Sequence, residues 1–145
     1  MTHSQLYERD FFAWANEQAA LLRSGKLAQA DIDHIAQEIE SMGKTEKREL
    51  VSRLTVLLLR LLKWRFQPEL RSTSWRLTVE EQRIQVETHM ADNPSLKAGL
   101  DQAIADAYRL AVIGARRETG LAAQTFPAAC PWSFHQVTDQ DFWPA

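Results

Sequence analysis

The longest apolar pattern in the chain covers residues 48–64, with the sequence RELVSRLTVLLLRLLKW. Its apolar positions occupy almost every side of a helical wheel, and such a helix must be surrounded by other elements or by lipid. Arg53, Arg60 and Lys63 interrupt the run, which is shorter than the roughly 20 apolar residues that a membrane span needs. The pattern therefore predicts a central helix, over residues 44–66, inside a soluble helical domain.

Apolar residues at the helical period of 3.6 predict four further helices, over about residues 4–23, 28–42, 74–91 and 94–119. Pro68 should end the central helix, because proline lacks the amide donor. Gly43 is expected to allow a tight reversal, so that the second and the central helix pack as an antiparallel pair. Asn93 and Pro94 favour the start of the last helix, and Gly120 favours its end.

Residues 125–145 have a different character, because aromatic residues alternate with prolines and show little helical period. The rings belong to Phe126, Trp132, Phe134, Phe142 and Trp143. We expect an arm that lies across the bundle, with each ring filling a surface hollow. If the arm did not fold back, it would be a partner-binding segment. Ser133 and Gln136 fit a capping box, which predicts one short helical turn.

No strand pattern or internal repeat is present, so the sequence predicts an all-α fold. We expect a bundle of about five helices with a central apolar helix and an aromatic C-terminal arm. The length of 145 residues, with 45% apolar and 25% charged residues, is typical of one globular domain, here spanning residues 1–145. The single cysteine, Cys130, excludes an intrachain disulfide and favours the cytoplasm. The first residues, MTHSQLYERDFFAW, show no secretion signal.

Charge is distributed unevenly along the chain. Residues 1–43 carry 3 basic and 7 acidic groups, residues 44–83 carry 10 and 5, and residues 84–145 carry 4 and 7. The basic middle is either an anion-binding patch or a set of basic helices packed between acidic ones, and the overall acidic charge favours the second. One polar stripe on the central helix consists of Glu46, Glu49, Arg53, Arg60, Lys63 and Gln67. It is either a solvent-facing seam or a row of cations that meets carboxylates or an anionic ligand.

Known catalytic motifs are missing from the sequence: it contains no phosphate-binding glycine loop, no GxSxG, no HExxH and no CxxC. Its four histidines, His3, His34, His89 and His135, are scattered. Asp31, His34 and Glu38 share one helical face, which would suit a divalent metal if another helix added carboxylates. Such faces are common on exposed helices, so we predict no metal site and no cofactor, and we expect Glu38 to form an ion pair between helices.

Arginines gather around Trp75 in the segment RSTSWRLTVEEQRIQ. Arginine beside an aromatic ring can stack on bases and grip phosphates. Alternatively, Trp75 belongs to the core and Arg71, Arg76 and Arg83 cover it with their stems. No helix-turn-helix accompanies the cluster.

Six motifs resemble one bacterial family in the right order: YERDFFAWANEQAALLRSG, EIESMGKTEKREL, LLLRLLKW, SWRLTVEEQR, DNPSL and TFPAACPWS. The family is domain of unknown function number 29, and the resemblance implies a small all-helical bundle with no established activity. The position of Arg60 is often a histidine in that family, and this chain lacks it. The polar family residues that match here are Glu38, Lys63, Trp75, Gln82 and Arg83.

The leading functional prediction is a non-enzymatic module that binds a protein partner or associates with itself. It is motivated by the missing catalytic motifs, the aromatic arm and a small-residue face on the last helix. The alternative is binding of nucleic acid or another polyanion by the basic segment 60–83. An enzyme acting through Glu38 and the basic stripe is the third possibility. The candidate binding residues are Glu38, Arg60, Lys63, Trp75, Arg76, Gln82 and Arg83.

Overall fold

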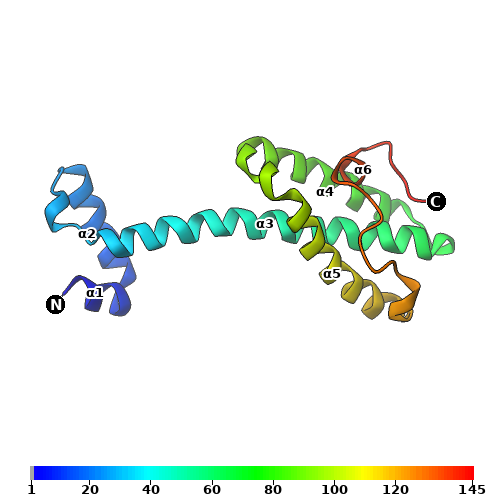
Figure 1. Ribbon diagram of the computed structural model, residues 1–145, viewed down its shortest axis with the longest axis horizontal. Helices are drawn as coiled ribbons and strands as arrows, with labels where there is room; N and C mark the ends of the chain where they lie inside the picture. Colours follow the sequence, from blue (N-terminus) through cyan, green and yellow to red (C-terminus); the bar gives the residue numbers. More distant parts are fainter. Residues whose placement is uncertain (1) are drawn as a thin grey trace. The chain divides into compact units, whose positions relative to one another are not determined.

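The computed structural model describes residues 2–145, apart from the side chains of His3 and Ser4. Within these residues every regular element is helical and no strand occurs, which confirms the all-α prediction. The described residues form six α-helices, and short 3₁₀ turns separate all of them except α1 and α2 (Figure 1). The α-helices are α1 His3–Arg9, α2 Phe11–Arg23, α3 Ile32–Phe66, α4 Thr73–Asp92, α5 Leu100–Thr119 and α6 Phe134–Thr138. The 3₁₀ turns are Leu27–Gln29, Pro68–Leu70, Pro94–Gly99 and Ala123–Thr125.

By its internal contacts the chain forms two compact units, Met1–Thr45 and Glu46–Ala145, which we call unit 1 and unit 2. Helix α3 begins in unit 1 and continues into unit 2. Whether the two units make up the single domain predicted for residues 1–145 stays a prediction. None of the helices in the described residues is both long enough and apolar enough to cross a membrane.

The single helix predicted for residues 4–23 is wrong, because the backbone breaks at Asp10 and two helices result. Asp10 has φ −145° and ψ 80°, and its carboxylate accepts a hydrogen bond of 3.1 Å from the amide of Ala13. An aspartate in this position caps the following helix by satisfying an amide that has no partner inside the helix. The local cap therefore competes with continuation of the first helix.

The predicted reversal at Gly43 is also wrong. Helix α3 runs without a break over 35 residues, so the predicted second and central helices are one helix. Gly43 is not among the glycines with positive φ, and a Cβ added to it would meet nothing within 4 Å. A glycine inside a helix costs only about 1 kcal/mol relative to alanine, which is too little to end a long helix. The antiparallel pair of second and central helices therefore does not form.

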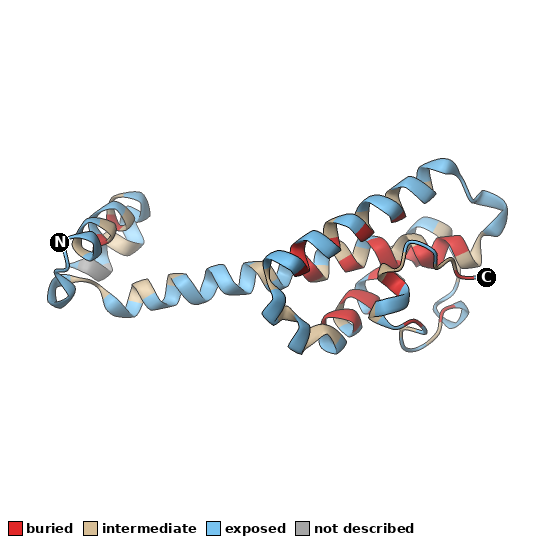
Figure 2. Ribbon diagram, turned by 90° about the horizontal axis from the view of Figure 1, so that it is seen from above, coloured by how far each residue is buried: buried red, intermediate tan, exposed pale blue. Residues whose placement is uncertain are grey.

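The core of unit 2 is built on the second half of α3, the predicted central helix. Six of its leucines are at most 1% exposed: Leu50, Leu54, Leu57, Leu58, Leu61 and Leu62. Helices α4 and α5 bury their own apolar faces in the same cluster (Figure 2). A Cβ added to Gly114 of α5 would lie 3.4 Å from Leu59, so the small-residue face of α5 allows a close approach to α3.

The predicted last helix starts later than expected. Residues Pro94–Gly99 form a 3₁₀ turn, and α5 begins at Leu100. Asn93 does not cap this turn, because its side-chain amide donates to the carbonyl of His89 at 3.1 Å. Gly120 ends α5 in the left-handed conformation, with φ 74°, where glycine is favoured.

The segment after Gly120 contributes to the core of unit 2. Phe126, Trp132 and Val137 are at most 8% exposed, and all three belong to the hydrophobic cluster. The ring of Phe126 packs edge-on against Phe66, with 5.1 Å between the ring centroids. Ser133 caps the short helix α6 in the expected capping box.

Candidate functional site

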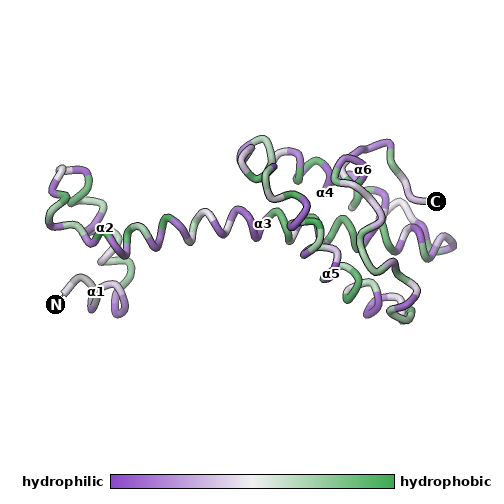
Figure 3. Tube along the Cα trace, viewed as in Figure 1, coloured by the Kyte–Doolittle hydropathy of each residue, from purple (hydrophilic) through white to green (hydrophobic). Residues whose placement is uncertain are grey.

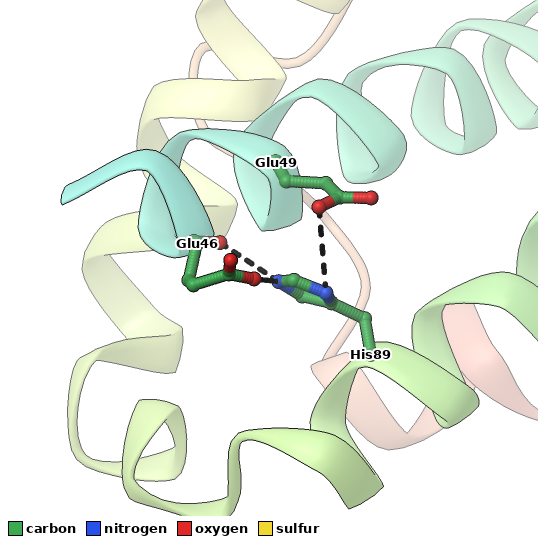
Figure 4. Close-up of side chains that lie close together, drawn as sticks. All are labelled: Glu46, Glu49 and His89. Carbon is green, nitrogen blue, oxygen red and sulfur yellow. Dashed lines mark hydrogen bonds and ion pairs between the residues drawn. The ribbon is translucent and has the colours of Figure 1, made fainter. Parts of the chain in front are cut away.

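Two glutamates of α3 and one histidine of α4 come together in unit 2 (Figure 4). Glu46 and Glu49 are three residues apart and therefore lie on the same face of α3. His89 lies in the last turn of α4. One carboxylate oxygen from each glutamate and one ring nitrogen of His89 all lie within 4.8 Å of one another. The three residues line a surface hollow of about 540 Å³, together with Arg53 and the end of α4. We call them the Glu–Glu–His cluster.

The imidazole of His89 is only 8% exposed, and its two nitrogens have different surroundings. Nε2 lies 2.8 Å from the backbone carbonyl of Glu46. Because a carbonyl oxygen only accepts hydrogen bonds, Nε2 carries the hydrogen and donates it. Nδ1 makes no hydrogen bond within the described residues and lies 3.7 Å from Oε2 of Glu49, too far for a hydrogen bond. The ring therefore directs an unbonded nitrogen at a carboxylate.

Arg53 holds the carboxylate of Glu49 in place. Its Nε and Nη2 donate to Oε1 of Glu49 at 3.2 and 3.0 Å, one helical turn away. This contact uses one oxygen of Glu49, and the other oxygen faces His89. A partly exposed ion pair of this kind contributes less than about 1 kcal/mol to stability. Its main effect is to orient the carboxylate.

Among the predicted site residues, Lys63 and Trp75 do meet, at a partly buried position. The ammonium group of Lys63 lies 4.7 Å from the ring centroid of Trp75 and 3.1 Å from Oε1 of Glu118. Lys63 is only 8% exposed. This part of the basic stripe is therefore neutralised by the chain's own residues.

Arg83 is 1% exposed and attaches α4 to the C-terminal segment. Its Nε donates to the carbonyl of Val137 at 2.8 Å, and Nη2 donates to the carbonyl of Phe142 at 2.7 Å. Burial lowers the pKa of this guanidinium. Arg76 and Arg83 both lie over the ring of Trp143, at 5.0 and 5.2 Å from its centroid. The contacts of Arg83 are those of a structural residue.

Two more predicted site residues, Arg60 and Gln82, carry buried atoms without a hydrogen-bond partner. In the described part of the chain, the buried atoms without a partner are Nε of Arg60, Oε1 of Gln82 and Nη1 of Arg83. No ion pair or hydrogen bond joins these three residues to one another within the described chain. Whether the predicted residues act as one site stays a prediction.

Glu38 lies in unit 1, and its partner is not the cation that the sequence suggested. It accepts a hydrogen bond from the hydroxyl of Tyr7, and this bond, together with burial, raises the pKa of that tyrosine. The ring of Tyr7 stacks on His34, with 4.0 Å between the ring centroids. The ion pair expected between Glu38 and the basic stripe assumed the reversal at Gly43, which is absent.

Asp31 and His34, the other members of the suspected metal face, pair with each other. The distance from Nδ1 of His34 to Oδ2 of Asp31 is 2.7 Å, and the indole of Trp14 donates to the same oxygen at 3.0 Å. Burial acts to raise the pKa of Asp31, but the hydrogen bonds from His34 and Trp14 outweigh it and hold that pKa below its usual value. These groups are occupied by the packing of unit 1.

From the sequence, Glu46 and Glu49 were predicted only as members of the polar stripe, and His89 was one of four scattered histidines. A signal for the cluster was nevertheless present. Two helices that meet at a tight turn pack antiparallel, so residues equally far from the turn lie opposite one another. Glu46 and Glu49 precede Pro68 by about as many residues as His89 follows it.

No curated protein and no solved structure matches the chain. A family model described as a domain of unknown function, DUF29, matches residues 6–143. The match covers nearly the whole chain and agrees with the resemblance carried by the six sequence motifs. The chain therefore belongs to the family of domain of unknown function DUF29.

Proposed function

We propose that the protein is a non-enzymatic self-association module, in which unit 1 packs against unit 1 of a second copy. The supporting observation is the imbalance between buried and exposed apolar surface in this unit. Among its described residues only Trp14 and Gln18 are buried, and Figure 2 shows it mostly in pale blue and tan. Seven large apolar side chains are 42–78% exposed: Phe11, Phe12, Leu22, Leu27, Ile32, Ile39 and Met42.

A unit of this size has little core of its own, and small units usually need another source of stability. Exposed apolar surface of this extent marks an interaction site. A second copy supplies the missing cover without requiring any further component, and closed pairs of identical chains are the commonest assemblies.

The first half of α3 offers the surface for this contact. Ile32 and Ile39 are seven residues apart, so they lie along one line of the helix, and Met42 follows three residues later. They are 53%, 58% and 61% exposed. Apolar turns recur between polar ones through this part of α3 (Figure 3). An apolar line with this spacing suits packing against another helix.

Charge favours an antiparallel arrangement of the two copies. Asp33 and Glu40 make the beginning of this helical segment acidic, whereas in its continuation Lys44, Lys47 and Arg48 outnumber Glu46 and Glu49. In an antiparallel pair the acidic end of one helix lies beside the basic end of the other. Such complementarity selects the partner and its orientation more than it adds affinity.

Sedimentation equilibrium of the full chain over a wide range of concentrations tests the proposal. We expect a monomer–dimer equilibrium, and we expect the double variant Ile32→Glu/Ile39→Glu to remain monomeric, because the apolar line would then carry four like charges in the dimer. The matched control is Leu77→Glu/Ile84→Glu on α4. Those residues are also seven apart and are 55% and 53% exposed.

A wild-type chain that stays monomeric at every concentration would overturn self-association. The proposed interface would be overturned as well if the α4 control dissociated the dimer and the α3 variant did not. Circular dichroism of both variants shows whether the helices persist, so that loss of the dimer is separated from loss of the fold.

Polyanion binding by the segment 60–83 has less support, because three of its cations already have partners in the chain. Lys63 is paired with Glu118, and Arg83 donates to two carbonyls. Arg71 donates to the carbonyl of Trp64 at 2.8 Å and lies over that residue's ring.

We also propose a cytoplasmic location, which the single cysteine suggests.

A further inference from the structure

In the Glu–Glu–His cluster, Nδ1 of His89 and Oε2 of Glu49 face each other without a hydrogen-bond donor between them. In its neutral form, with the hydrogen on Nε2, the imidazole of His89 presents a lone pair on Nδ1, and this nitrogen lies 3.7 Å from Oε2 of Glu49. Two acceptors then face each other, and the histidine is almost fully buried. Two acceptors that face each other without a donor between them repel. A cation between the two atoms would turn this repulsion into attraction.

We propose that Glu46, Glu49 and His89 bind a first-row divalent cation such as Zn²⁺ or Mn²⁺. Ligand bonds of about 2.1 Å hold two ligand atoms on one ion roughly 3 to 4 Å apart. The separation of Nδ1 and Glu49 Oε2 falls inside this range. The largest separation in the cluster is 4.8 Å, so the glutamate side chains must close by about one ångström. Their side chains are 45% and 41% exposed, so an adjustment of this size does not disturb the core.

The surroundings of the cluster resemble the outer shell of a metal site. A histidine that binds a metal through one nitrogen usually donates its other N–H to a carbonyl or a carboxylate. His89 does so, through Nε2 to the carbonyl of Glu46. Ligating carboxylates are hydrogen-bonded in turn, and Arg53 donates to Glu49 through the oxygen that does not face His89. Both ligands are therefore oriented before any ion arrives.

The donor set indicates the class of ion. One imidazole nitrogen with two carboxylates suits Zn²⁺, Mn²⁺ or Fe²⁺ better than Ca²⁺ or Mg²⁺, which prefer oxygen ligands alone. Three protein ligands leave at least one coordination position, and the hollow of about 540 Å³ has room for water there. The site belongs to unit 2 and does not depend on self-association through unit 1.

Titration of the full chain with Mn²⁺, followed by the electron paramagnetic resonance signal of the free ion, tests this site. We expect one Mn²⁺ per chain, displaced by Zn²⁺, which binds nitrogen–oxygen sites more tightly. Glu46→Gln and Glu49→Gln should each weaken binding by at least about tenfold, because each removes a charged ligand. Both positions are partly exposed, so these variants should keep the fold, and His89→Gln should abolish binding.

Two controls make the result specific. Glu87→Gln removes an exposed carboxylate from the same helix as His89, and His34→Gln removes the histidine that pairs with Asp31 in unit 1. Neither should change Mn²⁺ affinity. Absence of Mn²⁺ binding at millimolar concentration would overturn the proposal. Equal weakening by a control and a cluster variant would overturn it too.

Discussion

At the residue scale, one buried cation holds the C-terminal segment of unit 2. Arg83 reaches from α4 to the carbonyls of Val137 and Phe142, which are 54 and 59 residues further along the chain. Arginine suits this place because its planar guanidinium donates in two directions at once. Within the described residues no carboxylate forms an ion pair with this guanidinium, although Asp139 is close enough to favour its charge. Two carbonyls and the face of Trp143 make the direct contacts.

Replacing Arg83 by methionine should lower the free energy of unfolding by roughly 2–4 kcal/mol, because two carbonyls lose their donor. Urea unfolding followed by tryptophan fluorescence measures the change. Arg76→Met is the matched control, since Arg76 is exposed but touches the same Trp143 ring. It should cost less than about 1 kcal/mol. Equal effects of the two variants would contradict the attachment role of Arg83.

Tyr108 should make stability depend on alkaline pH. Burial raises its pKa from 10.0 to about 12, and its hydroxyl donates to the carbonyl of Pro127 at 2.6 Å. Because the folded-state pKa is the higher one, this contribution is complete below pH 10 and is lost as pH rises towards 12. Between pH 9 and pH 11 the wild-type chain should lose about 1 kcal/mol more stability than Tyr108→Phe.

Urea unfolding of both proteins at several pH values checks this prediction. The titration of lysines and of Tyr7 is common to the two proteins, so their difference isolates Tyr108. Parallel pH profiles for wild type and Tyr108→Phe would show that the tyrosine does not titrate as its burial implies.

At the scale of elements, α3 is one helix whose two halves have different surroundings. Its first half exposes Ile32, Ile39 and Met42, whereas its second half carries the leucines of the core. The helix continues through Gly43 because the hydrogen bonds of the turns on both sides of it outweigh the small cost of one glycine. A glycine ends a helix readily only where it adopts a positive φ, as Gly120 does after α5.

Replacing Gly43 by alanine should therefore raise helicity and stabilise α3 by about 0.5–1 kcal/mol. Space is available for the methyl group, since an added Cβ would meet nothing within 4 Å. Far-ultraviolet circular dichroism during thermal unfolding measures the effect. Gly120→Ala is the control, with φ 74° and an expected loss of about 1 kcal/mol. Destabilisation by Gly43→Ala would instead favour a turn at this position.

At the scale of the whole molecule, the main hydrophobic cluster lies entirely within unit 2. Its buried members run from Leu50 to Val137, and the partly buried side chains packed on them lie between Val51 and Trp143. Unit 1 adds none of these residues. The two units thus differ in kind, since unit 2 buries the whole cluster and unit 1, among its described residues, buries one apolar side chain, Trp14.

A chain shortened to residues 46–145 should fold with a cooperative unfolding transition, because it keeps every residue of the cluster. Urea unfolding of this fragment and of the full chain compares their midpoints, which should be similar. A fragment without a cooperative transition would show that unit 1 is needed to form the core, as expected of a single domain. Residues 1–45 by themselves should show no such transition, which circular dichroism can check.

The sequence by itself determined the all-α class, the family, and the helix ends at Pro68 and Gly120. The two helix ends depend on hydrogen bonds and backbone angles within a few residues. The all-α class and the family follow from patterns of residues along the sequence. Patterns within the sequence are therefore enough to predict all of them. The capping box of Ser133 and Gln136 is of the same kind. The cap at Asp10 is local as well, but the apolar stripe of residues 4–23 concealed it.

Only the tertiary structure decided which distant residues meet. Glu46 and Glu49 reach His89 because α3 and α4 pack against each other, and Arg83 reaches Val137 because the C-terminal segment returns to the core. Continuity at Gly43 depends on a balance between a small local cost and the stability of the whole helix. Local patterns carry neither the packing partner nor the burial of a charge, because both are set by parts of the chain that are far apart in sequence.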